Sequence, residues 1–250
     1  MKLSVFRAVM TASAMVFILS CAHKKVLIRP DASEAELREA LNQICSIGDL
    51  TKTAKGTAWI QARSSESKGR FPSHVLAEAR PSGDRLALEI NNPFGGVEGK
   101  IRVEKGGSAE MTCEVQIPGK PPRSEGVNGT WSGIPLRWAP ALFLGRIPCP
   151  QMAKGHRILI RADESGELWV TDDTSGEVFR YRLEAVEGRA WPETLVWETR
   201  GQRALRVEFK FEAPDAGTRS PSRFSVRAFQ IGKSESEISV RWQQRETSRN

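Results

Sequence analysis

The sequence lacks the residue patterns that mark most enzymes and metal-binding proteins. It contains no G-x-S-x-G, H-E-x-x-H, phosphate-loop or dinucleotide-binding motif, and its four cysteines include no C-x-x-C pair. Its three histidines also stand apart, because His23, His74 and His156 have no nucleophile and carboxylate grouped with them in the sequence. We therefore expect no catalytic residues, no metal site and no cofactor.

The sequence also lacks an apolar run that could cross a membrane as a helix. Such a helix needs about 20 apolar residues, and the apolar stretch Ala8–Leu19 is shorter than that. Because Lys2 and Arg7 precede it, the stretch has the charge pattern of a cleavable signal peptide rather than of an anchor. Residues 1–20 are therefore predicted to be removed from the mature protein.

Cys21 directly follows this stretch and is the predicted site of lipid attachment. Small and aliphatic residues in front of a cysteine, here Leu19 and Ser20, are the pattern that a lipoprotein signal peptidase recognises. Two or three acyl chains on one residue hold a protein durably at a membrane. Ala22 stands where an Asp tends to retain lipoproteins at the inner membrane, which favours the periplasmic face of the outer membrane. An ordinary secretory signal with a nearby cysteine is the alternative.

The composition after cleavage is that of a globular protein. Roughly 230 residues remain, enough for one sizeable domain or two small ones, and the chain has 39% hydrophobic and 27% charged residues. Its formal charge of +7 falls to about +5 without the signal peptide. The scattered basic residues form either a solvated face or a surface for anionic head groups or an acidic partner. We expect no nucleic-acid partner in the periplasm, and we expect a monomer.

Three cysteines remain besides Cys21, namely Cys45, Cys113 and Cys149. The periplasm permits disulfides, but an odd number leaves at least one cysteine outside any pair within the chain. No spacing in the sequence favours one pairing over the others, so the pairing of these residues stays open.

Most of the chain after residue 33 has the alternation of antiparallel strands. Residues 21–32 form an expected tether, and Ser33 with Glu36 makes a capping box for an amphipathic helix over Glu34–Ser46. Beyond it, about 11 segments place apolar residues at every second position, with turn residues between them. We predict a mainly β fold with minor α, in which a curled antiparallel sheet forms an open half-barrel over residues 33–250.

The stretch Pro118–Gly155 breaks this pattern and predicts a short helix. Pro140 suits the first turn of that helix and Gly145 its C-terminal cap. Helices here and at the N-terminus would cover the hydrophobic concave face of the sheet. That face is a core if it is packed tightly and a lipid pocket if it is packed loosely, and the sequence leaves both open. The residues expected to line such a pocket are Leu86, Leu88, Ile90, Ile101, Trp138 and Leu142.

One expected turn carries a large aromatic residue. The run Asn91-Asn92-Pro93-Phe94-Gly95-Gly96 lies between two expected strands, and its Asn-Pro and Gly-Gly pairs are typical of turns. A solvent-facing turn gains nothing from a phenylalanine. The Phe94 side chain therefore either folds back on the sheet or enters a membrane or the cavity of a partner, and the residues alone leave both open.

These segments together resemble the LolB family of outer-membrane lipoprotein receptors. That family has a strand of the form R-L-x-L, then N-P-L-G, then another strand, which resembles Arg85–Gly95 here. It also has a segment of the form I-P-L … W-x-L-G-x-P, which resembles Ile134–Pro148, and a later hairpin that 191–207 resembles more loosely. The likeness rests on the order and spacing of these motifs over residues 33–213, and residues 214–250 extend beyond the family's pattern as a less typical extension.

The resemblance implies a function as well as a fold. Receptors of this family take acylated lipoproteins from a soluble periplasmic carrier of LolA type and release them into the outer membrane without nucleotide. Phe94 takes the place of the family's protruding leucine, which implies a membrane-insertion loop of Pro93, Phe94 and Gly95. The implied partners are the acyl chains of the cargo, the carrier and the outer membrane. A lipid-binding or sensory lipoprotein of the same fold, or a structural envelope lipoprotein with a packed core, are the alternatives.

Overall fold

The computed structural model describes most of the chain from Ile28 onward. Cys21, the predicted signal peptide and most of the expected tether lie outside the described residues, so lipidation at Cys21 stays a prediction. Every described helix, strand and core residue lies between Ile28 and Arg249, so protein without residues 1–21 retains all of them. No helix in the described part is long and apolar enough to cross a membrane. The described residues are 28–64, 68–105, 111–125, 130–131, 134–151, 155–186, 189–199, 205–212, 214, 220–230 and 235–249.

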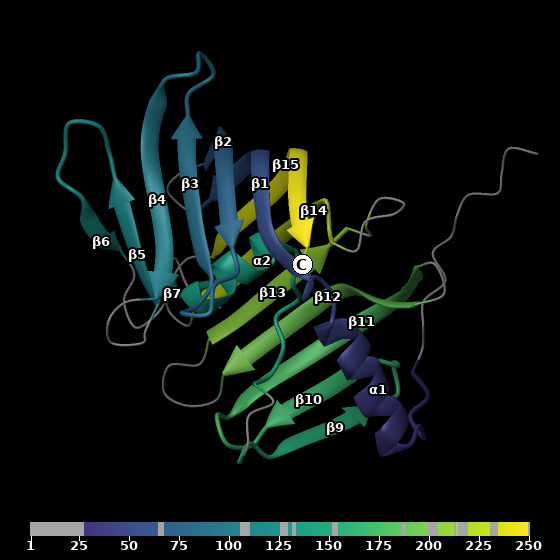
Figure 1. Cartoon of the computed structure of the whole chain (residues 1–250). Helices are drawn as coiled ribbons and strands as arrows, with labels where there is room; N and C mark the ends of the chain where they lie inside the picture. Colours follow the sequence, from purple (N-terminus) through teal and green to yellow (C-terminus); the bar gives the residue numbers. More distant parts are fainter. Residues whose placement is uncertain are drawn as a thin grey trace, which may run out of the picture.

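Thirteen strands of the described chain form one curled, open sheet, which confirms the predicted fold class (Figure 1). The strand order is β6-β5-β4-β3-β2-β1-β15-β14-β13-β12-β11-β10-β9, and all neighbours are antiparallel. The predicted number of strands, about 11, is too low, because a strand as short as β6 has no room for an alternating pattern. The strands of this sheet are β1 Thr51–Arg63, β2 Lys68–Glu78, β3 Arg85–Asn91, β4 Val97–Lys105, β5 Met111–Gln116, β6 Arg123–Glu125, β9 Ile158–Ala162, β10 Leu168–Asp172, β11 Glu177–Val186, β12 Arg189–Thr199, β13 Leu205–Phe211, β14 Arg223–Gln230 and β15 Ser236–Arg249. A separate two-stranded sheet pairs β7 Thr130–Trp131 with β8 Ile134–Pro135.

The two C-terminal strands lie in the middle of the sheet. β15 pairs with β1 along most of its length, for example Ile60 with Val240, and it pairs with β14 on its other side. Both strands come from the 214–250 region that extends beyond the LolB pattern. They join the first half of the sheet to the second, which is a contact between distant parts of the chain that no local pattern specifies.

Helix α1 (Glu34–Cys45) begins at the predicted capping box. The Glu36 backbone N–H donates a hydrogen bond to the Ser33 hydroxyl oxygen at 3.3 Å, and the Ser33 backbone N–H donates to Glu36 Oε2 at 2.8 Å. The helix packs on β9 and β12 of the second half of the sheet. Its buried residues are Leu37, Leu41 and Ile44.

A disulfide resolves the pairing that the sequence left open. Cys45, at the end of α1, is bonded to Cys149, and the two Cα atoms are 5.9 Å apart. Cys113 is buried on β5. The bond ties α1 to a segment 104 positions further along the chain. It therefore restricts the unfolded chain strongly, by about 4–5 kcal/mol in the loop-entropy description.

A short helical segment covers the inner face of the sheet. It consists of η1 (Leu136–Trp138) and α2 (Ala139–Leu144), which lie where the sequence predicts a helix. Pro140 lies in the first turn, and Gly145 ends the helix with a φ of 84°. α2 contacts β1, β2, β3 and β4, and Figure 1 shows it inside the curve of the sheet. We call η1 and α2 together the cover.

Candidate functional site

The turn between β3 and β4 holds Phe94 in solvent. The side chain of Phe94 is 97% exposed, and Figure 1 shows the turn at the far end of the two strands. Val97, the first residue of β4, is also exposed. Two of the four large hydrophobic side chains exposed in the described part of the chain therefore lie at this one turn; the other two are Leu50 and Leu159.

Asn92 builds the conformation of this turn, which we call the Phe94 turn (residues 92–96). Its Oδ1 accepts hydrogen bonds from the backbone N–H groups of Phe94 at 3.0 Å and Gly96 at 2.9 Å. The Asn92 backbone N–H donates to the Gly96 carbonyl oxygen at 2.8 Å, and Gly95 adopts a φ of 87° that favours glycine. The Phe94 side chain is thus displayed by a turn whose backbone N–H groups are hydrogen-bonded within the turn itself.

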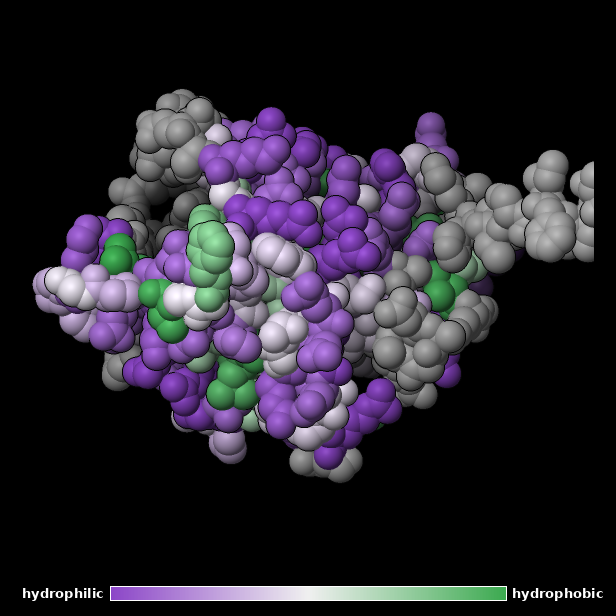
Figure 2. All heavy atoms as spheres, turned by 90° about the horizontal axis from the view of Figure 1, so that it is seen from above, coloured by the Kyte–Doolittle hydropathy of each residue, from purple (hydrophilic) through white to green (hydrophobic). Residues whose placement is uncertain are grey.

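An exposed phenylalanine on such a turn can supply binding energy when it enters an apolar environment. Full burial of this side chain is worth about 2–3 kcal/mol, which is a factor of about 30 to 150 in a partition equilibrium. Seen from the end of the molecule at which the turn lies, the surface is mostly hydrophilic, with hydrophobic residues in small separate areas (Figure 2). The turn therefore suits brief contact with an apolar phase.

The buried side chains on the inner face of β2–β5 are aliphatic except for Ser73 of β2 and Cys113 of β5. Cross-strand pairing aligns them in two rows, one through Val75, Leu88 and Ile101 and the other through Ala77 and Leu86. Leu142 of α2 is buried against the same core, and Ile90 is half-buried near the Phe94 turn. Five of the six residues predicted to line a lipid pocket are therefore buried in the core, and the sixth, Ile90, is half-buried against it; the five are Leu86, Leu88, Ile101, Trp138 and Leu142. We call the following set the aliphatic face: Val75, Ala77, Leu86, Leu88, Ile101, Val103 and Cys113.

Trp138, one of the five buried residues, lies in an aromatic cluster of the other half of the sheet. Its ring centroid lies 4.6 Å from that of Trp197, 5.4 Å from that of Phe209 and 6.3 Å from that of Phe179, all in edge-to-face arrangements. The partners belong to β11, β12 and β13. Trp138 therefore anchors the cover to the second half of the sheet, while α2 extends over the aliphatic face.

Two ion pairs hold the ends of the cover. Arg137 in η1 pairs with Glu177 at the start of β11. Beyond α2, Arg146 Nη1 lies 2.7 Å from Asp84 Oδ2, and both side chains are about three-quarters buried. Burial raises the pKa of Asp84, and the attraction of Arg146 and Lys52 offsets this only in part. The charged form of Asp84 is thus less favoured at this site than in water.

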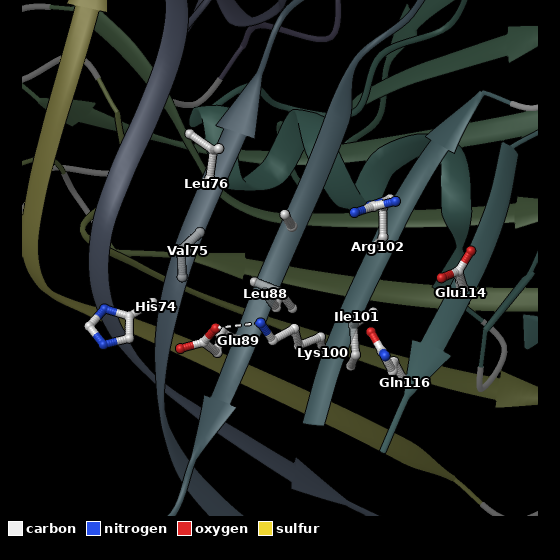
Figure 3. A pocket seen from close by; sticks show the side chains of 11 residues that line it. His74, Val75, Leu76, Leu88, Glu89, Lys100, Ile101, Arg102, Glu114 and Gln116 are labelled. Carbon is white, nitrogen blue, oxygen red and sulfur yellow. Dashed lines mark ion pairs between the residues drawn. The ribbon is translucent and has the colours of Figure 1, made fainter. Parts of the chain in front are cut away.

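A polar pocket lies on the opposite face of β2–β5 (Figure 3). Its volume is about 290 Å³. Because side chains alternate along a strand, the residues between those of the aliphatic face point here. Glu89 Oε2 and Lys100 Nζ form an ion pair across it at 3.1 Å, and Leu88 and Ile101 border it from the core side. The polar residues that line it are His74, Glu89, Lys100, Arg102, Glu114 and Gln116. No sequence motif indicates this pocket, although the same alternation that predicts the core also identifies the residues that line it.

One buried carboxylate in the second half has a structural role. Asp172 Oδ2 lies 2.7 Å from His156 Nδ1 and accepts a hydrogen bond from the Ser175 hydroxyl at 2.8 Å. Burial raises the pKa of Asp172, but the hydrogen bonds from His156, Ser175 and Thr174 outweigh burial and hold the pKa at about 2. The hydroxyl of Ser175 bonds to the carboxylate and not to the imidazole, so the three side chains fix the β10–β11 turn rather than activate a nucleophile. No group of metal-ligating side chains occurs within the described residues.

The architecture defines a class of fold, an open antiparallel half-barrel with a helical cover over its inner face. A DUF1329 family protein from Desulfovibrio piger has this fold, with a TM-score of 0.53, 10% identity and coverage of 83% of this chain and 93% of that one. A domain from Vibrio parahaemolyticus, named for outer membrane lipoprotein sorting, has a TM-score of 0.50, 10% identity and coverage of 85% and 93%. A LolA superfamily protein from Nitrosomonas europaea has a TM-score of 0.48, 11% identity and coverage of 86% and 94%. No family model and no curated protein sequence matches the chain. At these identities the likeness establishes the fold alone.

Proposed function

We propose that this protein is an outer-membrane lipoprotein, anchored through Cys21, that accepts acylated lipoproteins from a periplasmic carrier and inserts them into the outer membrane. The observation that carries the proposal is Phe94, which a self-contained turn holds 97% exposed. The LolB-like motifs imply a protruding apolar residue at this position. The fold, which is shared with a domain named for lipoprotein sorting, supports the same function. The transfer makes and breaks no covalent bond, so the role is not that of an enzyme.

The acyl chain of the cargo binds to the aliphatic face, in the place of the cover. Burying an acyl chain of about 15 methylene groups is worth about 12 kcal/mol. Withdrawing Leu142, Phe143 and Leu144, which are all buried, costs about 5–9 kcal/mol at about 1.5–3 kcal/mol for each side chain. The gain exceeds the cost by a few kcal/mol, so an acyl chain can displace α2, and α2 can return when the chain leaves.

The disulfide and the path of the cargo both support a site of action in the periplasm. A disulfide such as Cys45–Cys149 persists in an oxidising compartment such as the periplasm. The cargo moves from the apolar interior of the carrier to the aliphatic face and then to the bilayer, so its chains stay shielded from water and no nucleotide is required. Phe94 enters the bilayer at the last step and opens a path for the chains.

One observation favours a second candidate, a structural envelope lipoprotein with a packed core. Leu86, Leu88 and Leu142 are 2%, 6% and 3% exposed, so the inner face is filled by the protein's own side chains. In that case Phe94 contacts the membrane or another envelope protein, and the cover stays in place throughout.

A transfer assay separates the two candidates. Soluble protein without residues 1–21 is incubated with a LolA-type carrier loaded with a radiolabelled lipoprotein, and the label is followed to the protein and then to liposomes. Phe94→Glu is compared with Leu159→Glu, a matched change at another exposed hydrophobic residue, on the edge strand β9.

We expect the parent and Leu159→Glu to accept and deliver cargo, and we expect Phe94→Glu to accept cargo but deliver it at least tenfold more slowly. The expected difference in delivery rate follows from the loss of about 2 kcal/mol of apolar contact between Phe94 and the bilayer, because about 1.4 kcal/mol corresponds to each factor of ten. A parent protein that accepts no cargo from the carrier refutes the receptor function and leaves the structural candidate.

A further inference from the structure

A small basic pocket lies on the outer face of the sheet where its two halves meet. Its volume is about 210 Å³, and strands β1, β2, β14 and β15 line it. The guanidinium of Arg70 lies over the ring of Trp59, 4.5 Å from the centroid. Trp59 is the cross-strand partner of Arg241, which in turn is the partner of Arg223. Three arginines from three strands are thus gathered around one tryptophan.

The charges of this pocket are poorly neutralised within the protein. Arg223 Nη1 lies 2.9 Å from Glu212 Oε1. No carboxylate among the described residues forms an ion pair with Arg70 or Arg241. Like charges directly opposite each other on paired strands destabilise a sheet, so the Arg223–Arg241 pair is unfavourable in the isolated protein. An anion in the pocket would remove this repulsion.

The pocket and the Phe94 turn lie toward the same end of the sheet. Ser73 of β2 is paired with Ile90 of β3, which leads directly into the turn. Because β2 and β3 are antiparallel, decreasing residue numbers in β2 run in the direction in which β3 approaches the turn. Arg70, three positions before Ser73, therefore lies further toward the turn than Ser73 does. A membrane that receives Phe94 at its surface therefore also meets Arg70.

We propose that this pocket binds the phosphate group of an anionic membrane lipid while Phe94 enters the acyl region beside it. Arginine guanidinium groups match phosphate oxygens with paired N–H donors, and tryptophan favours the membrane–water interface. Attraction to an anionic membrane is worth about 1 kcal/mol for each basic residue near the surface. The inference deepens the proposed function, on which it rests, by giving the membrane-docking step its own binding site.

Vesicle co-sedimentation tests the proposal. Protein without residues 1–21 is mixed with phosphatidylcholine vesicles, or with vesicles that also contain phosphatidylglycerol, at low and high salt. The test variant combines Arg70→Gln with Arg241→Gln. The control combines Arg157→Gln with Arg161→Gln on and beside β9, which removes the same charge and includes an arginine stacked on a tryptophan, because Arg161 lies 4.9 Å from the Trp169 centroid.

The expected result is a loss of about tenfold or more in the partition coefficient of the test variant on anionic vesicles at low salt. The control variant stays within about twofold of the parent, and all three proteins bind phosphatidylcholine alike. An equal loss in both variants overturns the proposal in favour of general electrostatic attraction, and an undiminished test variant overturns it outright. The transfer assay is independent: a parent that accepts no cargo but docks through this pocket refutes the receptor function and leaves the lipid site standing.

Discussion

The two halves of the curled sheet bury different kinds of side chain. In the first half, β2–β5 present the aliphatic face, in which no buried residue is aromatic. In the second half, β11–β13 surround Trp138 with Trp197, Phe209 and Phe179 in edge-to-face contacts, and α1 and the Cys45–Cys149 disulfide support that half from the side. The chemistry of the core therefore changes across β1, β15 and β14.

Under the proposed function, this difference separates a scaffold from a binding surface. Aromatic rings in edge-to-face contact have a preferred mutual geometry, so they hold one arrangement of the strands. Aliphatic side chains have no such directional preference, and the methylene groups of an acyl chain can replace the contacts that Leu142 makes with them. The second half thus supports the cover through Trp138, and under the proposed function the first half exchanges the cover for a ligand.

Removing the disulfide should have the largest effect on stability. Cys45→Ser combined with Cys149→Ser releases a loop of 104 positions, which lowers the free energy of unfolding by about 4–5 kcal/mol in the loop-entropy description. Urea denaturation of the parent, with and without reductant, measures the effect. Reductant should reproduce the loss in the parent and have no effect on the variant. A loss below about 1 kcal/mol would show that the bond does not support the scaffold.

Truncating the centre of the aromatic cluster should have the next largest effect. Trp138→Ala is expected to cost about 3–4 kcal/mol of unfolding free energy, because it removes ring contacts with three partners and leaves a cavity. The matched variant Leu88→Ala in the aliphatic face should cost about 2–3 kcal/mol. Thermal or urea unfolding compares the two. If Leu88→Ala were the more damaging change, the aliphatic half would be the scaffold.

Acid should weaken the second half through Asp172. The folded pKa of about 2 lies below the ordinary value of 3.8, so Asp172 stabilises the fold fully above about pH 4 and loses this contribution as the pH falls toward 2. The size is about 2 kcal/mol. Unfolding free energies of the parent and Asp172→Asn should differ by that amount at pH 7 and converge near pH 2. A difference that does not depend on pH would exclude this carboxylate as the cause.

The smallest expected effect is at the ion pair beyond α2. Because the pKa of Asp84 is raised, its charge is disfavoured in the folded state relative to the unfolded chain, and Asp84→Asn should change the unfolding free energy by less than about 1 kcal/mol. The same change releases Arg146, so amide hydrogen exchange in α2 should become faster. Arg146→Met, which leaves the carboxylate of Asp84 without this partner, should cost more than Asp84→Asn. The reverse order would show that the pair itself stabilises the fold.

Local patterns predict much of this molecule and miss its long-range contacts. The alternation of Leu86, Leu88 and Ile90 predicts a strand with one buried face, and Ser33 with Glu36 predicts the start of α1, because each signal lies within a few residues. The pairing of β1 with β15 joins the two ends of the fold and has no local signal. The same is true of the disulfide.

The candidate site likewise has one part that local sequence predicts and other parts that only the three-dimensional structure shows. The Asn-Pro and Gly-Gly pairs of residues 91–96 predict a turn, but these residues alone do not decide whether the Phe94 ring points into solvent. That outcome depends on the hydrogen bonds of Asn92 and on the absence of a packing surface beside the ring. The basic pocket combines Trp59, Arg70 and Arg241 from three strands, so it becomes visible only once the strand order is known.

Hydrogen–deuterium exchange tests the central claim most directly. Protein without residues 1–21 is compared with and without a palmitoylated peptide, and uptake is followed in α2, β3, β11 and β12. The account predicts faster exchange in α2, slower exchange in β3 and no change in β11 and β12, because the acyl chain displaces the cover and protects the aliphatic face. Peptide binding that leaves α2 unchanged, or that changes β11 and β12 instead, would contradict it.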